Sequence, residues 1–289
     1  MSTSNAQAAS KAYSAFIPEI WSTKLQKLLH NSGAMMKCVN KDYEGEIKNG
    51  GDTVKIRSFS AVSVSTYTGT IESYSELTPT LQEMIIDQEK EFHFAVNDIG
   101  KAQSDINIMS GYLEEAKISV DLAKDTFLLG KHADVLTANT VGTVTAPITL
   151  SKDTIYAQFV ELAKRLKNAN AIETGKKAPW VIINPTIEAI LIQAPEFIHA
   201  TNAGDTVLRE GSIGKIAGLD VLVSTNLVAV SSKYYVLAGT NAAITYADQV
   251  VKVETLRDQS SFRDLVRGLY VYGAKTVKPA CLAKVIFAA

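Results

Sequence analysis

The middle of the chain carries its longest run of hydrophobic residues at helical spacing. From Ile106 to Phe127 the apolar positions recur three and four residues apart over about six turns, which predicts a single long helix. Ser104, just before it, has a side chain suited to capping the amino end. Because strand-like segments flank this helix, we expect it to lie on a sheet rather than in a coiled coil. The predicted apolar face consists of Ile106, Met109, Leu113, Ala116, Val120, Ala123 and Phe127.

Before this helix, hydrophobic and polar residues alternate as they do in β-strands. Asn49, Gly50 and Gly51 stand between two extended pieces, which predicts a β-hairpin. Residues 58–79 are rich in Ser, Thr and Tyr and have no helical period, so they predict a long extended excursion. Residues 81–96 then alternate, with one face made by Met84, Ile86, Phe92 and Phe94. The opposite face carries Glu83, Asp87, Glu89, Glu91 and His93.

The amino-terminal segment is polar at first and amphipathic afterwards. Residues 1–12 are mostly Ser, Ala, Asn and Gln, which cannot form a core, so we expect an arm or a disordered tail. A short helix should follow, opened by Pro18 and ended by Gly33. Its apolar face would consist of Ile17, Trp21, Leu25 and Leu28.

The second half of the chain predicts a mixed α/β unit at residues 151–240. It follows a connector at 137–151, rich in Gly, Pro and Thr, which is a candidate domain boundary. The unit should start with an amphipathic helix near Ser151, whose apolar residues are Ile155, Phe159, Leu162 and Leu166.

Strand, turn and helix signals continue through this unit. A strand at Trp180–Ile183 should lead into a helix that Asn184 caps and Pro185 opens, with Pro195 beyond its end. The glycine-rich segment 211–218 predicts a turn that delivers the chain into the next strand. Further strands are expected at 219–224 and 234–237.

The carboxy-terminal part predicts β structure throughout. Residues 244–278 are rich in Val, Tyr and Leu and predict three strands. Pro279 interrupts this pattern, and the apolar residues after it predict a last buried strand. Together the segments predict the α+β fold class.

Composition excludes several classes of protein. The chain has 289 residues, of which 46% are hydrophobic and 20% charged, as is typical of a globular protein. Its net charge of −1 lacks the basic excess of a protein that grips DNA specifically through many phosphates. It has neither a signal peptide at its start nor an apolar run of about 18 residues, so we expect a cytoplasmic product with no membrane contact. Cys38 and Cys281 are expected to be reduced.

The sequence offers no arrangement of residues typical of an active site. The four histidines have no partners at metal-ligand spacing, and there is no Cys-x-x-Cys. Gly214 and Lys215 are followed by Ile216 rather than by the Ser or Thr of a phosphate-binding loop, and no Gly-x-Ser-x-Gly is present. The acidic row near Glu89 is best explained as a solvated or partner-facing edge. We therefore predict no catalytic, metal or cofactor-binding residues, and no enzymatic activity.

Two segments have opposite net charges and no obvious place in a compact monomer. Residues 1–40 contain four lysines and one glutamate, a net charge of +3. Residues 41–91 contain five basic and ten acidic residues, a net charge of −5. Opposite charges on two extended segments favour contacts between neighbouring subunits. The predicted interface residues are Ile17, Trp21, Leu25, Leu28, Asn49, Gly50, Gly51, Asp52, Lys55, Arg57, Glu83, Asp87, Glu89 and Glu91.

In this order, the elements resemble the major capsid proteins of tailed phages, which have the Hong Kong 97-type fold. The resemblance rests on FIPEIWSTKLQKLL as the arm, EIKNGGDTVKIR through DQEKEFHFAV as the E-loop, SDINIMSGYLEEAKISVDLAKDTFLL as the spine helix, and GSIGKIAGLDVLVSTNL in the axial domain. It implies an N-terminal arm at 1–42, an E-loop and return strand at 43–91, and a peripheral domain with the spine helix at 92–150. It also implies an axial domain at 151–243, returning peripheral strands at 244–278 and a final axial strand at 279–289.

The resemblance also implies a function. The chain would self-assemble into pentamers and hexamers of an icosahedral head that encloses double-stranded DNA without binding it specifically. Assembly would take place in the host cytoplasm, with a portal protein and a separate scaffolding protein as partners. An encapsulin-like nanocompartment shell is the nearest alternative. A hydrolase built on residues 151–240 and a tail tube or adhesin are further alternatives.

Overall fold

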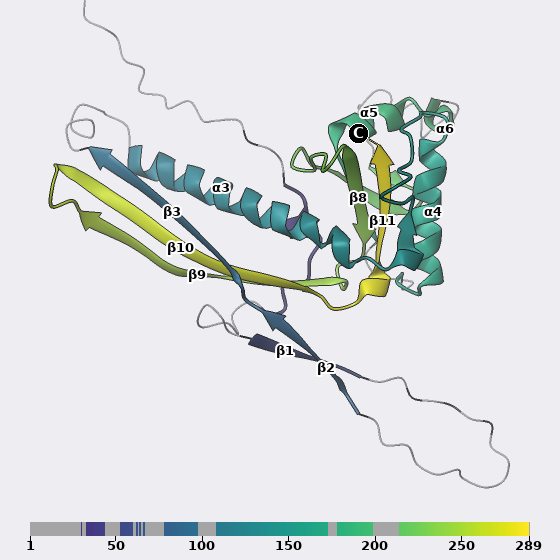
Figure 1. Cartoon of the computed structure of the whole chain (residues 1–289), viewed down its shortest axis with the longest axis horizontal. Helices are drawn as coiled ribbons and strands as arrows, with labels where there is room; N and C mark the ends of the chain where they lie inside the picture. The colour runs from purple at the N-terminus through teal and green to yellow at the C-terminus, as the bar shows by residue number, and fades with distance from the viewer. Residues whose placement is uncertain are drawn as a thin grey trace, which may run out of the picture.

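The computed structural model describes residues 30, 33–43, 53–59, 62, 64, 66, 78–97, 108–172, 178–198 and 214–288. Within them the chain forms sheets of six, three and two strands. The six-stranded sheet and its helices lie at one end of an elongated molecule (Figure 1). The three-stranded sheet and one long helix extend away from it, and the two-stranded sheet projects to one side. This mixture of helix and sheet confirms the predicted α+β class.

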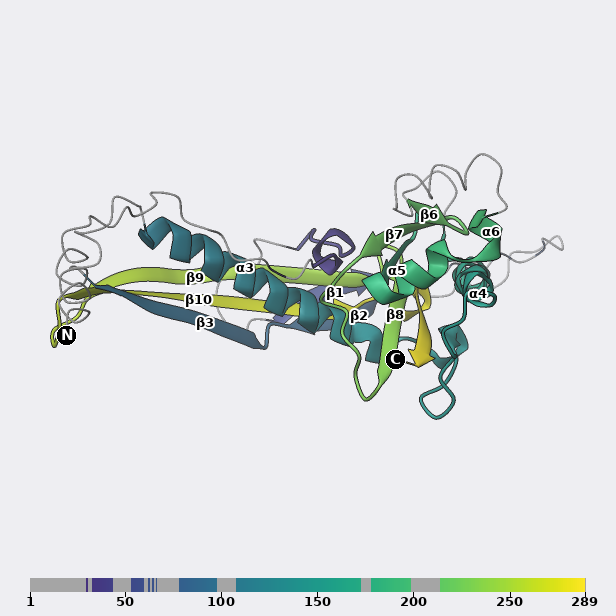
Figure 2. The same ribbon diagram turned by 90° about the horizontal axis from the view of Figure 1, so that it is seen from above.

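The long sheet has the strand order β3-β10-β9 and is antiparallel throughout. Its strands are β3 (Gln88–Asn97), β9 (Ile244–Arg257) and β10 (Arg263–Thr276). The helix α3 (Ile108–Leu129) lies along one face of this sheet (Figures 1 and 2). The Phe127 ring of α3 meets the Tyr272 ring of β10 edge-on, with centroids 5.5 Å apart. The predicted long helix on a sheet is confirmed, while Ser104 and Ile106 lie outside the described residues.

The prediction of three strands between residues 244 and 278 is wrong. The structure has two strands of 14 residues each, β9 and β10, joined by a short turn. β10 continues unbroken through Gly268 and Gly273. A side chain at either position would clash with Phe92 or with Ile85, which explains why both residues are glycine. A register shift between Leu269 and Tyr270 is accommodated within the β9–β10 pairing.

The six-stranded sheet has the order β4-β11-β8-β5-β7-β6. The β11–β4 and β5–β7 pairs are parallel, and the other three are antiparallel. Its strands are β4 (Thr140–Val141), β5 (Trp180–Ile183), β6 (Lys215–Ile216), β7 (Leu219–Val223), β8 (Lys233–Gly239) and β11 (Leu282–Ala288). The predicted strands at 180–183, 219–224 and 234–237 and the last strand are thus confirmed.

Helix α4 (Ile155–Asn168) covers this sheet with the apolar face that its spacing predicts. The four predicted side chains are fully buried: Ile155, Phe159, Leu162 and Leu166. The Phe159 ring lies 6.5 Å from the ring of Phe287 in β11. Two shorter helices follow β5, α5 (Pro185–Ile192) and α6 (Pro195–Ile198). Short 3₁₀ helices occur at Met35–Lys37, Gly130–Asp134, Thr137–Asn139 and Pro279–Cys281.

Several predicted caps and turns are present in this region. The Asn184 side chain accepts a hydrogen bond from the backbone N–H of Ile187, 2.9 Å away, and Pro185 opens α5. Pro195 stands beyond the end of α5 and opens α6. Ala217 and Gly218, both with positive φ (51° and 85°), form the two-residue turn between β6 and β7.

The connector at 137–151 lies at the edge of the six-stranded sheet. It contributes β4, and Ile148 forms a further parallel bridge to Phe287 beside it. Arg165 of α4 holds the connector by donating from Nη1 to the backbone oxygens of Ala138 (2.6 Å) and Thr140 (2.8 Å). The segment predicted as a boundary is therefore packed against both the sheet and α4.

The two-stranded sheet consists of β1 (Thr53–Ser58) and β2 (Thr80–Ile85), paired antiparallel. The predicted turn at Asn49–Gly51 lies outside the described residues, and the partner that the structure shows for β1 is β2. The alternating segment 81–96 is two strands rather than one, because the chain passes from β2 into the long sheet at Ile86–Asp87. Its alternation is nevertheless confirmed, since Met84 and Ile86 are buried while the odd-numbered residues are exposed.

No helix in the part of the chain that the structure describes is long and apolar enough to cross a membrane. Cys38 is buried and Cys281 half-buried, and no disulfide joins them.

Candidate subunit interface

The side projection of the molecule is anchored in its own chain at the base. We call it the limb: β1, β2 and the described residues that continue from them, 59, 62, 64, 66, 78 and 79 (Figure 1). The inner face of its base is buried against the long sheet. This small core consists of Val54, Ile56, Met84, Ile86, Ala247 and Val271. The base of the limb is therefore a fixed part of the folded subunit.

The outer face of the limb mixes charged and apolar side chains. Lys55 is paired with Glu83 across the two strands, with Nζ and Oε1 3.9 Å apart. Arg57 stands opposite Leu81 in the same register. Leu81 and Ile85 keep 49% and 57% of their surface exposed. Three predicted interface residues, Lys55, Arg57 and Glu83, thus share one outward face with two apolar neighbours.

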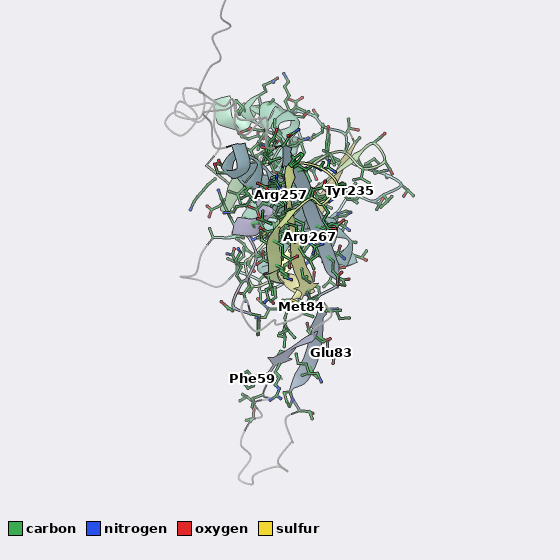
Figure 3. The ribbon with its side chains drawn as sticks, turned by 90° about the vertical axis from the view of Figure 1, so that its left-hand side faces the viewer. Phe59, Glu83, Met84, Tyr235, Arg257 and Arg267 are labelled. Atoms are coloured by element: carbon green, nitrogen blue, oxygen red, sulfur yellow. The ribbon has the colours of Figure 1, made fainter. Side chains whose placement is uncertain are left out.

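The limb carries further exposed apolar residues beyond its strands. Phe59 is fully exposed (101%), and Val62 and Val64 are largely so. Figure 3 labels Phe59 at the far end of β1, with Glu83 and Met84 on the facing strand. After Arg57 the sequence has no charged residue until Glu72. Covering exposed apolar surface of this kind contributes a favourable free energy of about 25 cal/mol per Å². Such surface therefore marks an interaction site.

Sequence reasoning missed these apolar residues, although two signals were present. Leu81 and Ile85 have the same odd-numbered positions as Glu83, which places them on the exposed face of an alternating strand. The uncharged run between Arg57 and Glu72 is the second signal, because solvated surface segments normally carry charge.

The acidic row lies on a different surface from the limb's outer face. Asp87 is in the turn between β2 and β3, and Glu89 and Glu91 are exposed on β3. Glu89 is opposite Val271, so the two side chains lie on the same face of the sheet. Val271 packs under the limb's base, whereas its neighbour Tyr272 meets Phe127 of α3. The row is therefore on the sheet face away from α3. The predicted interface residues of the described chain therefore form two groups, one on the limb and one on β3.

The predicted arm helix lies outside the described residues. This covers Ile17, Trp21, Leu25 and Leu28, and the same is true of Asn49, Gly50, Gly51 and Asp52. The structure does describe His30 and 33–43, which form the end of the predicted arm. The His30 Nε2 atom lies 2.9 Å from Glu115 Oε2 of α3. The Met35 N–H donates to Asp125 Oδ1 at 2.7 Å. The segment is thus attached to α3 at two points.

The same segment also extends the long sheet. Asn40 pairs in parallel with Thr245 of β9, donating its N–H to the Ile244 oxygen and accepting from the Tyr246 N–H, each at 2.9 Å. Asp125, the acceptor for Met35, is itself buried and also accepts from Asn226 Nδ2 at 2.9 Å. One carboxylate on α3 therefore fixes both this segment and the loop after β7.

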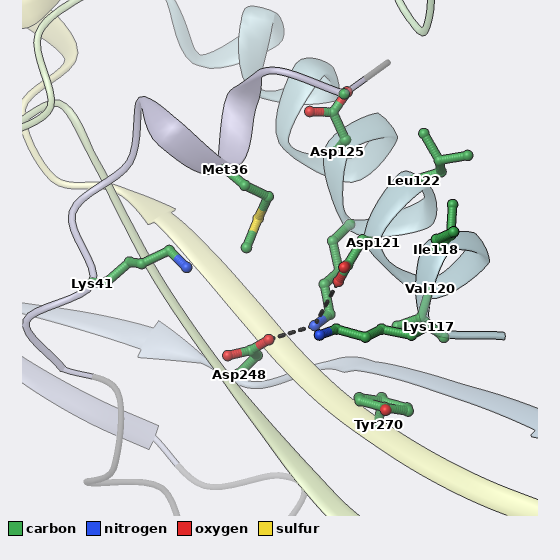
Figure 4. A pocket seen from close by; sticks show the side chains of 12 residues that line it. Met36, Lys41, Lys117, Ile118, Val120, Asp121, Leu122, Asp125, Asp248 and Tyr270 are labelled. Atoms are coloured by element: carbon green, nitrogen blue, oxygen red, sulfur yellow. Dashed lines mark hydrogen bonds and ion pairs between the residues drawn. The ribbon is translucent and has the colours of Figure 1, made fainter. Parts of the chain in front are cut away.

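A cavity of about 760 Å³ opens between this segment, α3 and the long sheet (Figure 4). Lys124 of α3 reaches across it to Asp248 of β9, with Nζ and Oδ2 2.5 Å apart, and lies 3.6 Å from Asp121. Its ammonium group is also 5.2 Å from the centre of the Tyr270 ring. Together these contacts join α3 to the long sheet.

Sequence reasoning gave no sign that Lys124 and Asp125 are buried. Both follow Ala123 in the predicted apolar stripe. Their partners Met35 and Asp248 are 90 and 124 residues away in sequence. No group of three or more His, Cys, Asp or Glu in the described ranges could hold a metal ion.

The family described as phage capsid protein matches residues 123–285, more than half of the chain. The chain belongs to the phage capsid protein family. It is therefore a structural protein of the virion capsid, a multimeric shell. No curated protein matches the chain.

Solved structures agree with this family over nearly the whole length of the capsid protein. A chain of Mycobacterium phage Che8 is 29% identical, with a TM-score of 0.75 over 94% of this chain and 97% of that chain. The capsid of the cyanophage P-SCSP1u has a TM-score of 0.75 at 13% identity, over 95% of this chain and 94% of that one. The capsid of Ralstonia phage GP4 has 0.69 at 11% identity, over 94% and 95%. The predicted resemblance to tailed-phage major capsid proteins and their Hong Kong 97-type fold is confirmed.

Proposed function

We propose that this capsid protein self-assembles into pentamers and hexamers of an icosahedral phage head that encloses double-stranded DNA. The observation that carries the proposal is the limb, which is rooted in its own chain and extends exposed apolar residues beyond it. Exposed apolar surface of this kind typically marks a site that another molecule covers. In a shell built from many copies of one chain, the molecule that covers the limb would be a neighbouring copy.

The limb is proposed to be the E-loop and to lie across a neighbouring subunit. Lys55, Arg57 and Glu83 would supply the polar contacts that set its register, and Leu81 and Ile85 the buried area. The acidic row from Asp87 to Glu91 and the arm residues from Ile17 to Leu28 are proposed to contact other copies. Residues 151–243, together with the final strand β11, would form the axial domain at the centre of each capsomer, with β4 added at the edge of its sheet.

The net charge of −1 fits a wall that encloses DNA without gripping it. We propose a portal protein and a separate scaffolding protein as further partners, with assembly in the host cytoplasm. The subunit is proposed to catalyse no reaction. The alternative of an encapsulin-like compartment differs in its contents, which would be a cargo enzyme rather than DNA.

Electron microscopy of particles purified from infected cells tests this function. Closed icosahedral shells that protect double-stranded DNA from nuclease are the expected result. Shells that contain a cargo enzyme and no DNA would favour the compartment. A chain that stays monomeric at high concentration and yields no particle would contradict both.

Limb variants test the observation that carries the proposal. Replacing Leu81 and Ile85 together by Ser should leave the subunit folded, because both side chains are already exposed, yet should block shell assembly. Val144→Ser is the matched control, since Val144 is similarly exposed but lies in the connector beside the six-stranded sheet. Circular dichroism reports folding and sedimentation reports assembly. Normal shells from the double variant would show that the limb is not an interface.

A further inference from the structure

The last residues of the predicted arm lie inside the subunit. We call residues 33–40 the arm end. Asn40 pairs with Thr245 at the start of β9, which fixes one end of this segment. The core that contains residues of α3 and of the six-stranded sheet also contains four residues of the arm end: Ala34, Met35, Cys38 and Val39. The arm end is therefore built into the interior of the molecule rather than laid on its surface.

A single buried carboxylate receives the arm end on α3. The Asp125 side chain is 1% exposed, and its Oδ1 atom accepts the Met35 N–H at 2.7 Å. The chain passes so close to it that a Cβ atom on Gly33 would lie 2.9 Å from Asp125 Cγ. Figure 4 shows Asp125 at the point where the arm end crosses α3. A displacement of the arm end would therefore withdraw a donor from a buried acceptor, which is costly.

The second oxygen of Asp125 accepts a bond from the six-stranded sheet. Asn226, in the loop between β7 and β8, donates from Nδ2 to Asp125 Oδ2 at 2.9 Å. The same amide nitrogen lies 3.0 Å from Thr126 Oγ1 and 3.3 Å from the Leu122 backbone oxygen, both on α3. Asn226 thus attaches the loop to one turn of the long helix, at the residue that also holds the arm end.

The loop that carries Asn226 is fixed to the six-stranded sheet at both ends. Ser224 at its start is fully buried, and its N–H donates to a backbone oxygen of β5 at 2.8 Å. At its other end the backbones of Val230 and Lys233 exchange two hydrogen bonds, of 2.9 and 3.1 Å, which close a two-residue turn. A displacement at Asn226 is therefore passed on to the sheet.

We propose that Asp125 couples the placement of the arm end to the attachment of the six-stranded sheet on α3. The Met35 N–H holds the carboxylate in the orientation that accepts from Asn226, and Asn226 holds it in place for Met35. Such a coupling is reciprocal, so each contact weakens when the other is lost. Asp125 is the positioning residue of this arrangement.

The coupling is a property of one subunit and goes beyond the proposed function. It has a consequence for assembly that does rest on that function. If residues 17–28 of the arm contact other copies, a contact that displaces the arm end would also loosen the six-stranded sheet from α3. The experiments below use the unassembled full-length subunit, so their outcomes do not depend on whether shells form.

The natural cysteine of the arm end reports on its placement. Cys38 is fully buried, so iodoacetamide reaches its thiol only when the arm end opens. Asn226→Ala should speed the alkylation of Cys38 about tenfold, although Asn226 belongs to another segment. Peptide mass spectrometry separates the Cys38 product from that of Cys281. An unchanged rate in Asn226→Ala would overturn the coupling.

Asn184→Ala is the matched control for this measurement. Asn184 is another asparagine attached to the six-stranded sheet, but its side chain caps α5 and makes its bond there. Its loss should lower the stability of the subunit while the alkylation of Cys38 under native conditions stays unchanged. Equal acceleration by the two variants would show a general loss of stability and no specific link.

Gly33→Ala tests the coupling from the other side. The added methyl group displaces the Asp125 carboxylate, so amide hydrogen exchange should become faster at residues 224–230, in the loop after β7. Gly130→Ala is the control, because its methyl group would enter open space. Unchanged exchange at 224–230 in Gly33→Ala would contradict the proposal.

Asp125→Asn tests whether Asp125 itself carries the link. The amide keeps one acceptor oxygen and presents its amino group to the second donor, so only one of the two bonds can form. In the Asp125→Asn background, Asn226→Ala should therefore no longer change the alkylation rate of Cys38. A persistent tenfold effect in that background would show that the arm end and the loop are linked through other residues.

Discussion

The ring of Phe92 lies directly against Gly268, its opposite partner in the β3–β10 ladder. A methyl group at Gly268 would sit 2.2 Å from the Phe92 ring carbon Cε1, well inside contact distance. The same ring lies 5.9 Å from the ring of Tyr270, two residues further along β10. Gly268 is therefore required by the aromatic side chain that covers it, and the strand passes through a glycine without breaking.

Gly268→Ala is expected to destabilise the subunit by about 1–2 kcal/mol, because the half-buried Phe92 ring must shift to admit the methyl group. Urea denaturation measures this. In the Phe92→Ala background the same change should have little effect, since the clash is gone. Equal effects of Gly268→Ala in the two backgrounds would contradict this explanation.

Asn184→Ala is expected to destabilise the subunit by about 1 kcal/mol. The side chain is buried and caps α5 through its bond to the Ile187 N–H, which would lose its acceptor. Asn184→Asp keeps an acceptor oxygen and serves as the control. Thermal unfolding compares the three proteins. An unchanged melting temperature for Asn184→Ala would show that the cap does not contribute.

The Lys124–Asp248 ion pair should respond unequally to loss of its two members. The Lys124 side chain is 6% exposed and that of Asp248 is 24% exposed. Asp248→Ala should therefore be the more destabilising change, lowering the free energy of unfolding by about 3 kcal/mol. It leaves the buried Lys124 ammonium with only the more distant Asp121. Lys124→Met leaves a carboxylate that water can reach. Chemical denaturation of both variants checks the order, and the reverse order would contradict it.

His132 is expected to make the subunit less stable in mild acid. Burial beside the Tyr235 ring, whose centroid is 4.2 Å away, lowers the pKa of His132 below its usual value of 6.5. Lys284 and Asp134 are the charged groups near it. The native state then binds a proton less readily than the unfolded chain, so stability is full above about pH 6.5 and falls as the pH drops through that value.

His132→Phe tests this dependence, because phenylalanine keeps an aromatic ring next to Tyr235 but cannot take up a proton. Melting temperatures are measured between pH 8 and pH 5, above the range in which most carboxylates titrate. The natural subunit should lose more stability over this range than the variant. Parallel curves for the two proteins would exclude His132 as the cause.

Local elements were predictable because their signals lie within one segment. The apolar spacing of Ile155 to Leu166 defines α4, and the strand, cap and proline sequence from Trp180 to Pro185 defines β5 and the start of α5. The order of these elements was also sufficient to indicate the capsid fold, because that order can be read without knowing which residues touch.

Long-range relationships were not predictable from the same signals. The pairing of β1 with β2 joins strands more than 20 residues apart, and no local rule selects that partner over another strand. Lys124 and Asp125 are buried because Asp248 and the Met35 N–H reach them from distant segments. Exposure is likewise a property of the folded chain, so Phe59 and Phe262 could be identified as surface residues only in the structure.

Both margins of the six-stranded sheet end in strands of only two residues, β4 and β6. So short a margin offers few free amide and carbonyl groups to an incoming chain. A margin of two residues pairs poorly with a strand from another copy, so this sheet resists the edge-to-edge growth by which fibres form.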